Sequence, residues 1–564
     1  MKLVIIGGVA GGASAAARAR RLDEHAQIVM FERGEHISYA NCGLPYHVGG
    51  VIEKREQLLL MTPERFKARA AVDVRTSQEV VQINRTAKTV SVVDRASGKQ
   101  YEENYDRLIV ATGSRPKKPA IPGIDDPDVM VMWNLSDMNE VKDRVNDGIR
   151  RALIVGGGYI GLEMAENFRQ LNIETVLVQR SGQLMSVLDP EMAQPLADCL
   201  RKNGVCIHFN TTVQRLQRRV IGTNEDETEL LVELSNGQTL ATDLVLVAAG
   251  IQPNSELAAQ AGLAVGEHGG IVVNARLQTS DPDIYAVGDV IEVTDPVIGM
   301  PAQIPLAGPA NRQGRMAADN ALGGENMFGG SIGTSICKVF DLTVASAGPN
   351  EKTLRRMKTP YHKVYLNPFS HATYYPQAKQ MHMKMLFNPD GRVLGAQIVG
   401  TQGVKERIDV LATAIQTKMD VWTLGQLELA YAPPYGSAKE PVNYAGFLAV
   451  NLLEGKTENV YADAIPPTAF LLDVREPSEF AAGAIPQAVL IPLGQLRSRL
   501  TEVPREREVI VYCQVGIRGY IAERILRQNR FAVRNLSGGY VTWRLFQAPS
   551  EPPAATGERT GGCS

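Results

Sequence analysis

The sequence predicts an α/β protein, because short apolar runs end in glycine turns and lead into helical segments. Two such runs, residues 2–6 and 151–155, precede glycine motifs, and a further α/β pattern begins at residue 470. With 564 residues, the chain is long enough for several separate cores. These observations predict two nested Rossmann-like dinucleotide-binding domains and a separate C-terminal α/β domain.

The composition excludes several classes of protein. The formal net charge is -2, so no global basic field would draw the chain to nucleic acid or to an anionic membrane. Six widely spaced cysteines indicate neither a disulfide framework nor a paired-cysteine metal site, and they fit a reducing compartment. The apolar N-terminal run is too short for a signal peptide, and no stretch is long enough for a bilayer. A cytoplasmic protein is therefore predicted.

The first glycine motif follows the strand at residues 2–6. Gly7 and Gly12 flank the turn, and the next strand ends on Glu32, where a carboxylate can bind the two hydroxyls of an adenosine ribose. The pyrophosphate would lie at the helix N-terminus. Val9 replaces the middle glycine of GxGxxG, so the backbone must approach the ligand there with a side chain present.

The second glycine motif is a full GxGxxG opening a helix, which indicates a second dinucleotide. The strand after it ends on Gln179 and Arg180 instead of an acid. Arg180 offers a cation to a 2′-phosphate, so NADPH stays open beside NADH, and a solvated surface arginine is the alternative. The motif consists of Gly156, Gly158, Tyr159, Ile160 and Gly161, with Gly157 between the first two glycines.

Three further strand ends, ATGS at 111–114, AAGIQPN at 248–254 and IYAVGD at 284–289, resemble the two-dinucleotide flavoprotein disulfide reductases. This resemblance implies FAD in the first domain and NAD(P)H in the second. It implies that Asp289 binds the FAD ribityl chain. The other cofactor-binding residues expected from it are Arg33, Val80, Ala111, Thr112, Gly113, Gly250, Pro305, Leu306 and Ala307.

A single cysteine, Cys42, stands in the segment YANCGLPY, and position 47 is histidine where the two-cysteine reductases have a second cysteine. The segment resembles a narrower branch: coenzyme A-disulfide reductases, persulfide reductases, and NADH oxidases and peroxidases. The resemblance implies that Cys42 attacks a substrate sulfur and receives electrons from reduced FAD.

The residues near position 10, GVAGGAS, lack the histidine typical of the oxidases and peroxidases and are similar to coenzyme A-disulfide reductases. The likeness implies a CoA channel leading to Cys42, in which guanidinium groups hold phosphates. A solvated helix face is the alternative for the arginines. The channel residues expected are Ser14, Arg18, Arg21, Ser38, Asn41, His371 and Lys439.

The segments HATYYP and AYAPPYGSAK carry the next resemblance to coenzyme A-disulfide reductases. It implies a homodimer in which Tyr375 and Tyr431 reach the partner's active cysteine, where a phenol can donate a proton to the leaving thiolate. Tyr374 and Tyr435 are adjacent alternatives.

Near the C-terminus, Cys513 ends a predicted strand and precedes a helix, a position that stabilises an anionic sulfur. The segments DVREPSEF, CQVGIR and NLSGGY resemble a single-domain rhodanese, which implies that Cys513 carries sulfane sulfur as a persulfide. AIPQA at 484–488 lacks the histidine of the usual HIPGA. The short spacing from Cys513 to Arg518 disfavours a phosphatase. The loop residues are Gln514, Val515, Gly516, Ile517 and Arg518.

The predicted activity is FAD-dependent reduction of CoA persulfide or polysulfide by NAD(P)H, with CoA disulfide as a second substrate and the rhodanese-like domain supplying sulfane sulfur. The alternatives are an NADH oxidase or peroxidase that cycles Cys42 through sulfenic acid, and a redox-sensing binding protein. The predicted ranges are 1–115 and 245–325 for FAD, 116–244 for NAD(P)H, 326–450 for an α+β dimerisation domain, 451–463 for a linker, 464–550 for the rhodanese-like domain and 551–564 for a mobile tail.

Overall fold

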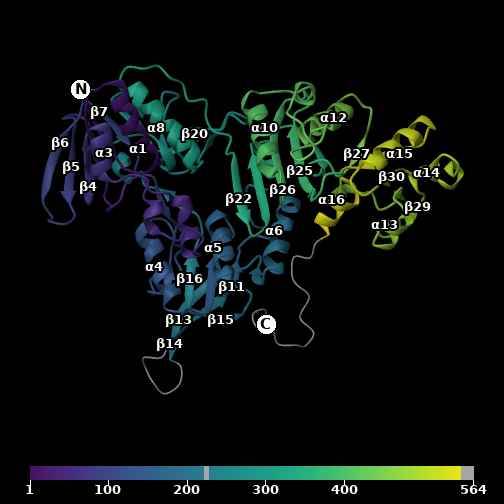
Figure 1. The fold of residues 1–564 in the computed structure, drawn as a ribbon, viewed down its shortest axis with the longest axis horizontal. Helices are drawn as coiled ribbons and strands as arrows, with labels where there is room; N and C mark the ends of the chain where they lie inside the picture. Colours follow the sequence, from purple (N-terminus) through teal and green to yellow (C-terminus); the bar gives the residue numbers. More distant parts are fainter. Residues whose placement is uncertain (221–227, 548–564) are drawn as a thin grey trace. The chain divides into compact units, whose positions relative to one another are not determined.

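The computed structural model describes residues 1–220 and 228–547, which form two compact units (Figure 1). One unit holds Met1–Arg180 and Gly204–Gly333, and the other holds Ser181–Asn203 and the described residues from Thr334 onward. The predicted tail at 551–564 and the last residues of the rhodanese-like range lie outside the described residues. Among the helices of the described residues, none is long and apolar enough to cross a membrane.

The first unit begins with a five-stranded parallel sheet in the order β19-β7-β1-β2-β3. Helices α1 (Ala10–Leu22) and α8 (Ala307–Ala321) pack closely on one another. The two helices can approach closely because Gly314 has no side chain: a Cβ there would lie 2.1 Å from the carbonyl oxygen of Gly11. The strands are β1 (Lys2–Ile6), β2 (Gln27–Phe31), β3 (Asp73–Arg75), β7 (Arg107–Val110) and β19 (Ile284–Ala286), and an antiparallel sheet adds β4 (Gln78–Asn84), β5 (Thr89–Asp94) and β6 (Gln100–Asn104).

A second five-stranded parallel sheet in the same unit has the order β12-β11-β10-β16-β9. It repeats the strand, glycine turn and helix of the first, so the prediction of two Rossmann-like domains is confirmed. Its elements are β9 (Val129–Met130), β10 (Arg151–Val155), β11 (Glu174–Val178), β12 (Val205–His208) and β16 (Leu244–Val247), with helices α4 (Leu135–Asn146) and α5 (Tyr159–Gln170) and the antiparallel strands β13 (Val213–Val220), β14 (Thr228–Leu234) and β15 (Thr239–Thr242).

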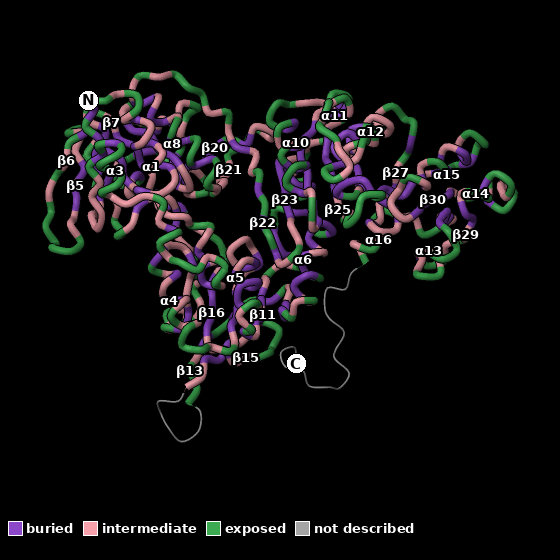
Figure 2. Tube along the Cα trace, viewed as in Figure 1, coloured by how far each residue is buried: buried purple, intermediate pink, exposed green. Residues whose placement is uncertain are grey.

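The second unit contains a five-stranded antiparallel sheet in the order β22-β23-β26-β25-β24. Every residue of its central strand, β26, is buried, and Figure 2 shows buried backbone in purple at the neighbouring strands β23 and β25. This sheet with its helices is the predicted α+β domain. The elements are β22 (Ser335–Val339), β23 (Leu342–Ala347), β24 (His362–Leu366), β25 (Met381–Phe387), β26 (Val393–Gly400), α10 (Val404–Gln416), α11 (Val421–Gly425) and α12 (Pro441–Leu453).

The C-terminal part of this unit is a parallel sheet in the order β27-β31-β30-β28-β29, as predicted for a rhodanese-like α/β domain. Its two faces bury separate apolar clusters, one around Val511 and one around Tyr512. The elements are β27 (Asn459–Val460), β28 (Phe470–Asp473), α13 (Pro477–Ala481), β29 (Val489–Leu490), β30 (Val509–Tyr512), α15 (Ile517–Gln528), β31 (Val533–Leu536) and α16 (Gly539–Phe546).

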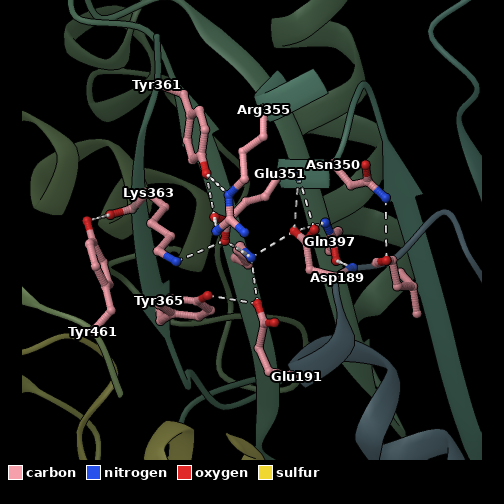
Figure 3. Close-up of polar contacts among 12 residues, drawn as sticks. Asp189, Glu191, Asn350, Glu351, Arg355, Tyr361, Lys363, Tyr365, Gln397 and Tyr461 are labelled. Atoms are coloured by element: carbon pink, nitrogen blue, oxygen red, sulfur yellow. Dashed lines mark hydrogen bonds and ion pairs between the residues drawn. The ribbon is translucent and has the colours of Figure 1, made fainter. Parts of the chain in front are cut away.

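A buried cluster of charged side chains, in which Figure 3 labels Asp189, Glu191 and Glu351, anchors helix α6 (Pro190–Lys202) to the antiparallel sheet of the second unit. Lys384 on β25 is fully buried, and its Nζ lies 2.7 Å from Asp189 and 2.5 Å from Glu191 and also contacts Glu351. The ammonium group therefore occupies the centre of the three carboxylates. Because unpaired buried charges are costly, these contacts fix the start of α6 against β25.

Candidate active sites

The first glycine turn has the geometry of a dinucleotide cradle. Gly7 has φ +104°, and a Cβ there would lie 2.2 Å from the carbonyl oxygen of Ala111. A Cβ on Gly12 would lie 1.8 Å from the carbonyl oxygen of Gly7, so helix and strand pack too closely for a side chain. Glu32, at the end of β2, accepts a hydrogen bond from the backbone N–H of Gly8 through Oε2 at 2.9 Å.

The second glycine turn repeats this arrangement. Gly156 has φ +112°, and a Cβ on Gly161 would lie 1.9 Å from the carbonyl oxygen of Gly156. A Cβ on Gly158 would meet no atom within 4 Å, so open space faces the turn at the middle glycine. The packing requirement and the open space fit a pyrophosphate lying against the helix N-terminus, at Tyr159 and Ile160.

Gln179 takes the place in the second domain that Glu32 takes in the first. Its Oε1 accepts a hydrogen bond from the backbone N–H of Gly157 at 3.0 Å. An amide fills the position of the ribose-binding acid, and Arg180 beside it is exposed at the end of β11. The structure thus keeps both nicotinamide dinucleotides compatible with this domain.

The expected FAD-binding segments at 111–114, 248–254 and 284–289 lie next to one another in the first unit. Thr112 and Asn254 exchange two hydrogen bonds of 2.8 Å, which align the predicted small-residue turns. Asp289 accepts a hydrogen bond from the hydroxyl of Ser114 at 2.9 Å, and burial raises the pKa of Asp289. A Cβ on Gly113 or Gly250 would meet nothing within 4 Å, so these segments also leave room for a ligand.

The remaining residues expected at the cofactors lie at the surface or in the core of the first unit. Val80 is buried on β4, and Arg33 is exposed after β2. Leu306 precedes the first residue of α8, with Pro305 and Ala307 exposed on either side.

Cys42 occupies a 3₁₀ turn, Asn41–Gly43, directly before helix α2 (Leu44–Val48). The residue is exposed, yet surrounding protein removes part of the water from its sulfur. This desolvation raises the pKa of Cys42, and the negative charges of Glu163 and Asp289 raise it further. The protein groups around Cys42 therefore favour the thiol over the thiolate.

Glu163, on α5, is a site residue that the sequence analysis did not single out. Burial raises its pKa to about 7, and repulsion from Glu166 adds to the shift. Its position near the start of the predicted helix that follows the second glycine motif was visible in the sequence. Its influence on Cys42 was not, because helix α2 meets α5 only in the folded chain.

A pocket of about 350 Å³ lies between α1 and α8 of the first unit. Three residues of the expected CoA channel, Ser14, Arg21 and Ser38, line it, and Asn311 and Arg315 were not foreseen. Ser14 donates a hydrogen bond to Oδ1 of Asn311 at 2.5 Å. The full lining is Ala13, Ser14, Ala17, Arg21, Ser38, Met61, Phe66, Asn311 and Arg315.

Two other residues expected in the CoA channel make contacts outside that pocket lining. Arg18 forms an ion pair with Asp319, with 2.7 Å between Nε and Oδ1. The side-chain amide of Asn41 lies 3.5 Å from the carbonyl oxygen of Trp133, at the outer limit of a hydrogen bond. Arg18 would therefore have to leave Asp319 before its guanidinium could bind a phosphate.

The expected tyrosines gather in the second unit on an exposed surface. The hydroxyl oxygens of Tyr374 and Tyr431 lie 2.7 Å apart. The ring of Tyr375 packs edge-on against His371, with 5.7 Å between the ring centroids. All three tyrosines and Tyr435 are exposed.

His371 and Lys439, the other two residues expected at CoA, differ in accessibility. His371 is buried, and its ring nitrogens lie 3.0 Å from the hydroxyl of Ser370 and 3.0 Å from the carbonyl oxygen of Pro376. A contact between His371 and CoA would have to replace one of these bonds. Lys439 is exposed and can meet a ligand.

In the C-terminal domain, Cys513 follows β30 and is almost fully buried. The backbone N–H of Gly516 donates a hydrogen bond to its Sγ at 3.1 Å, and Gly516 has φ +107°. Ile517 then begins α15, while Gln514 and Val515 complete the loop. A backbone N–H aimed at the sulfur before a helix N-terminus favours an anionic sulfur at this position.

The Gly538–Gly539 turn packs against the backbone of this loop. A Cβ on Gly539 would lie 2.4 Å from the carbonyl oxygen of Cys513, and the N–H of Tyr540 donates to that oxygen at 2.8 Å. Asn367, after β24, donates from Nδ2 to the carbonyl oxygen of Gly538 at 3.0 Å. The sulfur-binding loop is therefore held by the antiparallel sheet domain.

Three family matches cover most of the chain. Residues 1–321, more than half of the chain, match the family described as pyridine nucleotide-disulphide oxidoreductase. Residues 334–441 match the dimerisation domain of that family. Residues 457–545 match the rhodanese-like domain.

Individual proteins give a consistent result. A coenzyme A disulfide reductase of Staphylococcus haemolyticus is 34% identical over 80% of this chain and 100% of its own length. The solved structure of reduced Bacillus anthracis CoADR-RHD is 44% identical, with a TM-score of 0.93 over 96% of this chain and 98% of that one. An NAD-dependent persulfide reductase from A. fulgidus is 38% identical, with a TM-score of 0.90 over 96% and 100%. The chain therefore belongs to the pyridine nucleotide-disulphide oxidoreductases, is an oxidoreductase whose fold implies FAD and NAD(P)H binding, and carries a rhodanese-like domain.

Proposed function

We propose that this protein reduces CoA persulfide or polysulfide with NAD(P)H and also reduces CoA disulfide. The observation that carries the proposal is the pocket holding Arg21 and Arg315, whose lining residue Ser38 stands four positions before the exposed Cys42. Two guanidinium groups can bind the phosphates of CoA. The relatives named for CoA disulfide and for persulfide reduction support the same substrates.

The residues of the first unit fit the two dinucleotides that the family implies. Glu32 and the turn at Gly7 and Gly12 suit the adenosine half of FAD, Asp289 suits its ribityl chain, and the turn at Gly158 suits NAD(P)H. When bound, FAD would deliver to the sulfur on Cys42 the two electrons it takes from NAD(P)H.

Cys42 is the nucleophile in this proposal. Attack of its thiolate on the inner sulfur of CoA persulfide forms a Cys42–CoA disulfide and releases hydrosulfide, whereas attack on the outer sulfur forms a Cys42 persulfide and releases the CoA thiolate. Two electrons then break the new S–S bond and restore the Cys42 thiolate. Either route converts one NAD(P)H, one proton and one CoA persulfide into NAD(P)⁺, CoA thiol and hydrogen sulfide.

Tyr431 and Tyr375 are proposed to protonate the leaving thiolate in the partner's site. The dimerisation-domain match and the exposed tyrosine surface support a homodimer. The hydrogen bond with Tyr374 raises the pKa of Tyr431, so its phenol keeps the proton that a general acid must donate.

The rhodanese-like domain is proposed to supply the sulfane sulfur. Cys513 would carry it as a persulfide, stabilised by the N–H of Gly516. Covalent attachment of this carrier to the reductase raises the local concentration of the donor. The wide spacing of the six cysteines along the sequence supports action in a reducing compartment such as the cytoplasm.

The test is anaerobic oxidation of NADH and of NADPH by the purified flavoprotein, with CoA persulfide and CoA disulfide in parallel and sulfide detected as a product. Rapid oxidation with sulfide release supports persulfide reduction and identifies the preferred nicotinamide. Oxidation that starts only when oxygen or peroxide is admitted contradicts the proposal and establishes the oxidase or peroxidase alternative.

A further inference from the structure

The cation of the sulfur-binding loop is already bound by a carboxylate of the same domain. Arg518, in the first turn of α15, donates from both terminal nitrogens to Glu479 on α13, and both bonds are 2.7 Å long. The hydrogen bonds to Glu479 raise the pKa of Arg518, and the Cys513 sulfur interacts with the same guanidinium. Glu479 thus fills the guanidinium fork that faces the reacting sulfur.

A second arginine beside the loop is equally engaged. Arg475 is fully buried and donates to both carboxylate oxygens of Asp473 at 2.7 to 3.0 Å. Its other terminal nitrogen donates to Oε1 of Gln514, the residue after Cys513, at 3.1 Å. Arg475 therefore supports the loop but cannot turn toward a ligand without leaving Asp473 buried and unpaired.

These contacts determine what kind of sulfur donor the loop can hold. A donor whose transferable sulfur is bonded to an oxyanion, such as thiosulfate, would be recognised by a free guanidinium fork, since the two N–H groups of this fork can bind two oxygens of one oxyanion, as they do with phosphate. The structure places the Glu479 carboxylate in that position. A persulfide of the type R–S–S⁻ has no oxyanion at its sulfur and needs no such fork.

We propose that Glu479 is a specificity residue that makes Cys513 accept sulfur from organic persulfides and reject thiosulfate. This inference rests on the proposed sulfurtransferase function of Cys513 and names its donor class. The Cys513 thiolate attacks the outer sulfur of R–S–S⁻, the S–S bond breaks, and its electron pair leaves with R–S⁻. Cys513 is left as Cys513–S–S⁻, and with thiosulfate the leaving group would be sulfite.

The ion pair is accessible enough for an incoming donor to compete with it. The side chains of Arg518 and Glu479 are 30% and 29% exposed, respectively, so water screens the pair only in part. Neutralising Glu479 would free the fork without emptying a buried site. The buried pair of Arg475 and Asp473 lacks this accessibility and stays intact.

The test uses the full-length protein with Cys42→Ser, without NAD(P)H, so that only Cys513 turns over. Ethyl persulfide and thiosulfate serve as donors, and cyanide accepts the sulfur, which leaves as thiocyanate and restores the Cys513 thiolate. Glu479→Gln is compared with Glu502→Gln, because Glu502 also holds an arginine, Arg499, by two bonds of 2.7 Å in the same domain. Glu502→Gln therefore matches the change in charge and the released arginine away from the loop.

Glu479→Gln should raise kcat/KM for thiosulfate about tenfold, the effect of one charge-assisted hydrogen bond, while kcat/KM for ethyl persulfide changes less than about twofold. Glu502→Gln should leave the ratio of the two values unchanged. Equal use of both donors by the protein with native Glu479, or parallel changes for both donors in Glu479→Gln, would overturn the inference. Thiocyanate formation from neither donor would instead refute the sulfurtransferase function on which it rests.

Discussion

The hydroxyl oxygens of Tyr374 and Tyr431 lie 2.7 Å apart on the exposed surface of the antiparallel sheet domain. Removing one hydroxyl separates their roles, because only the group that protonates the leaving thiolate affects chemistry directly. Tyr431→Phe should lower kcat for CoA persulfide by roughly 10²-fold, and Tyr374→Phe by much less. Stopped-flow reduction and the pH profile of kcat check this. A larger effect of Tyr374→Phe would assign the acid to Tyr374.

Cys42 and Cys513 should be separable by substitution. Cys42→Ser should abolish NAD(P)H oxidation with every sulfur substrate while the protein remains yellow, because the serine hydroxyl cannot form the disulfide. Cys513→Ser should stop sulfur transfer and spare reduction of free CoA persulfide. Assays of both activities on both variants, with Cys337→Ser as a buried control, measure the separation. Substantial reduction by Cys42→Ser would remove the central proposal.

Arg315 should contribute to binding rather than to chemistry. Arg315→Ala removes a guanidinium from the pocket lined also by Arg21, so KM for CoA persulfide should rise about tenfold with little change in kcat. Arg312→Ala is the matched control, because Arg312 lies on the same helix but not in the pocket lining. Steady-state kinetics with CoA persulfide test the pair. An equal rise in KM for both variants would contradict a phosphate contact at Arg315.

Glu163 should depress the reactivity of Cys42 as it ionises. The Glu163 charge raises the pKa of Cys42, so Glu163→Gln should lower the pKa of that thiol. The rate of Cys42 alkylation by iodoacetamide against pH, followed by peptide mass spectrometry, measures the shift. Glu174→Gln, at the start of β11, is the control. An unchanged midpoint in Glu163→Gln would exclude the electrostatic coupling.

The same carboxyl should leave a signature in stability. Its pKa of about 7 in the folded protein lies above the ordinary value of 4.5 for a glutamate, so the folded state binds the proton more tightly. Its contribution to the free energy of unfolding is therefore present below about pH 4.5 and lost as pH rises to about 7. Glu163→Gln should flatten the pH dependence of urea unfolding within this window.

Lys384 should be essential for the stability of the second unit. Lys384→Met would leave Asp189, Glu191 and Glu351 buried without their shared cation, which should cost about 3–5 kcal/mol of unfolding free energy. Lys405→Met, which breaks an exposed and solvent-screened pair with Asp409, should leave the free energy of unfolding nearly unchanged. Urea unfolding of both variants measures the difference. If both variants lost a similar amount of unfolding free energy, the buried cluster around Lys384 would contribute no more than an exposed ion pair.

The same cluster should make the free energy of unfolding depend on pH in acid. Burial alone would raise the pKa of Glu351, but Lys384 and Lys363 hold it at about 2. The stability from this lowered pKa is present above about pH 4.5 and is lost as pH falls toward 2. Lys384→Met should weaken this acid dependence.

Local patterns were sufficient for the architecture. Apolar strands running into glycine turns predicted both Rossmann-like domains, and the strand before Cys513 predicted the third parallel sheet. The turns could be recognised because their constraints are local. Gly7 and Gly156 have positive φ, and each packs its carbonyl oxygen against a second glycine five residues later, Gly12 or Gly161, where a Cβ would collide. The family resemblance drawn from those motifs is confirmed by the matches over residues 1–321 and 457–545.

The sequence by itself predicted which residues would carry the chemistry, because Cys42, Glu32 and Cys513 lie in short motifs whose spacing is readable along the chain. Only the tertiary structure decided which groups adjust them. Glu163 affects Cys42 across 121 positions of sequence, and Glu479 meets Arg518 across 39. Charge interactions depend on distance in space, and helix and sheet packing brings together carboxylates and cations that no local pattern connects.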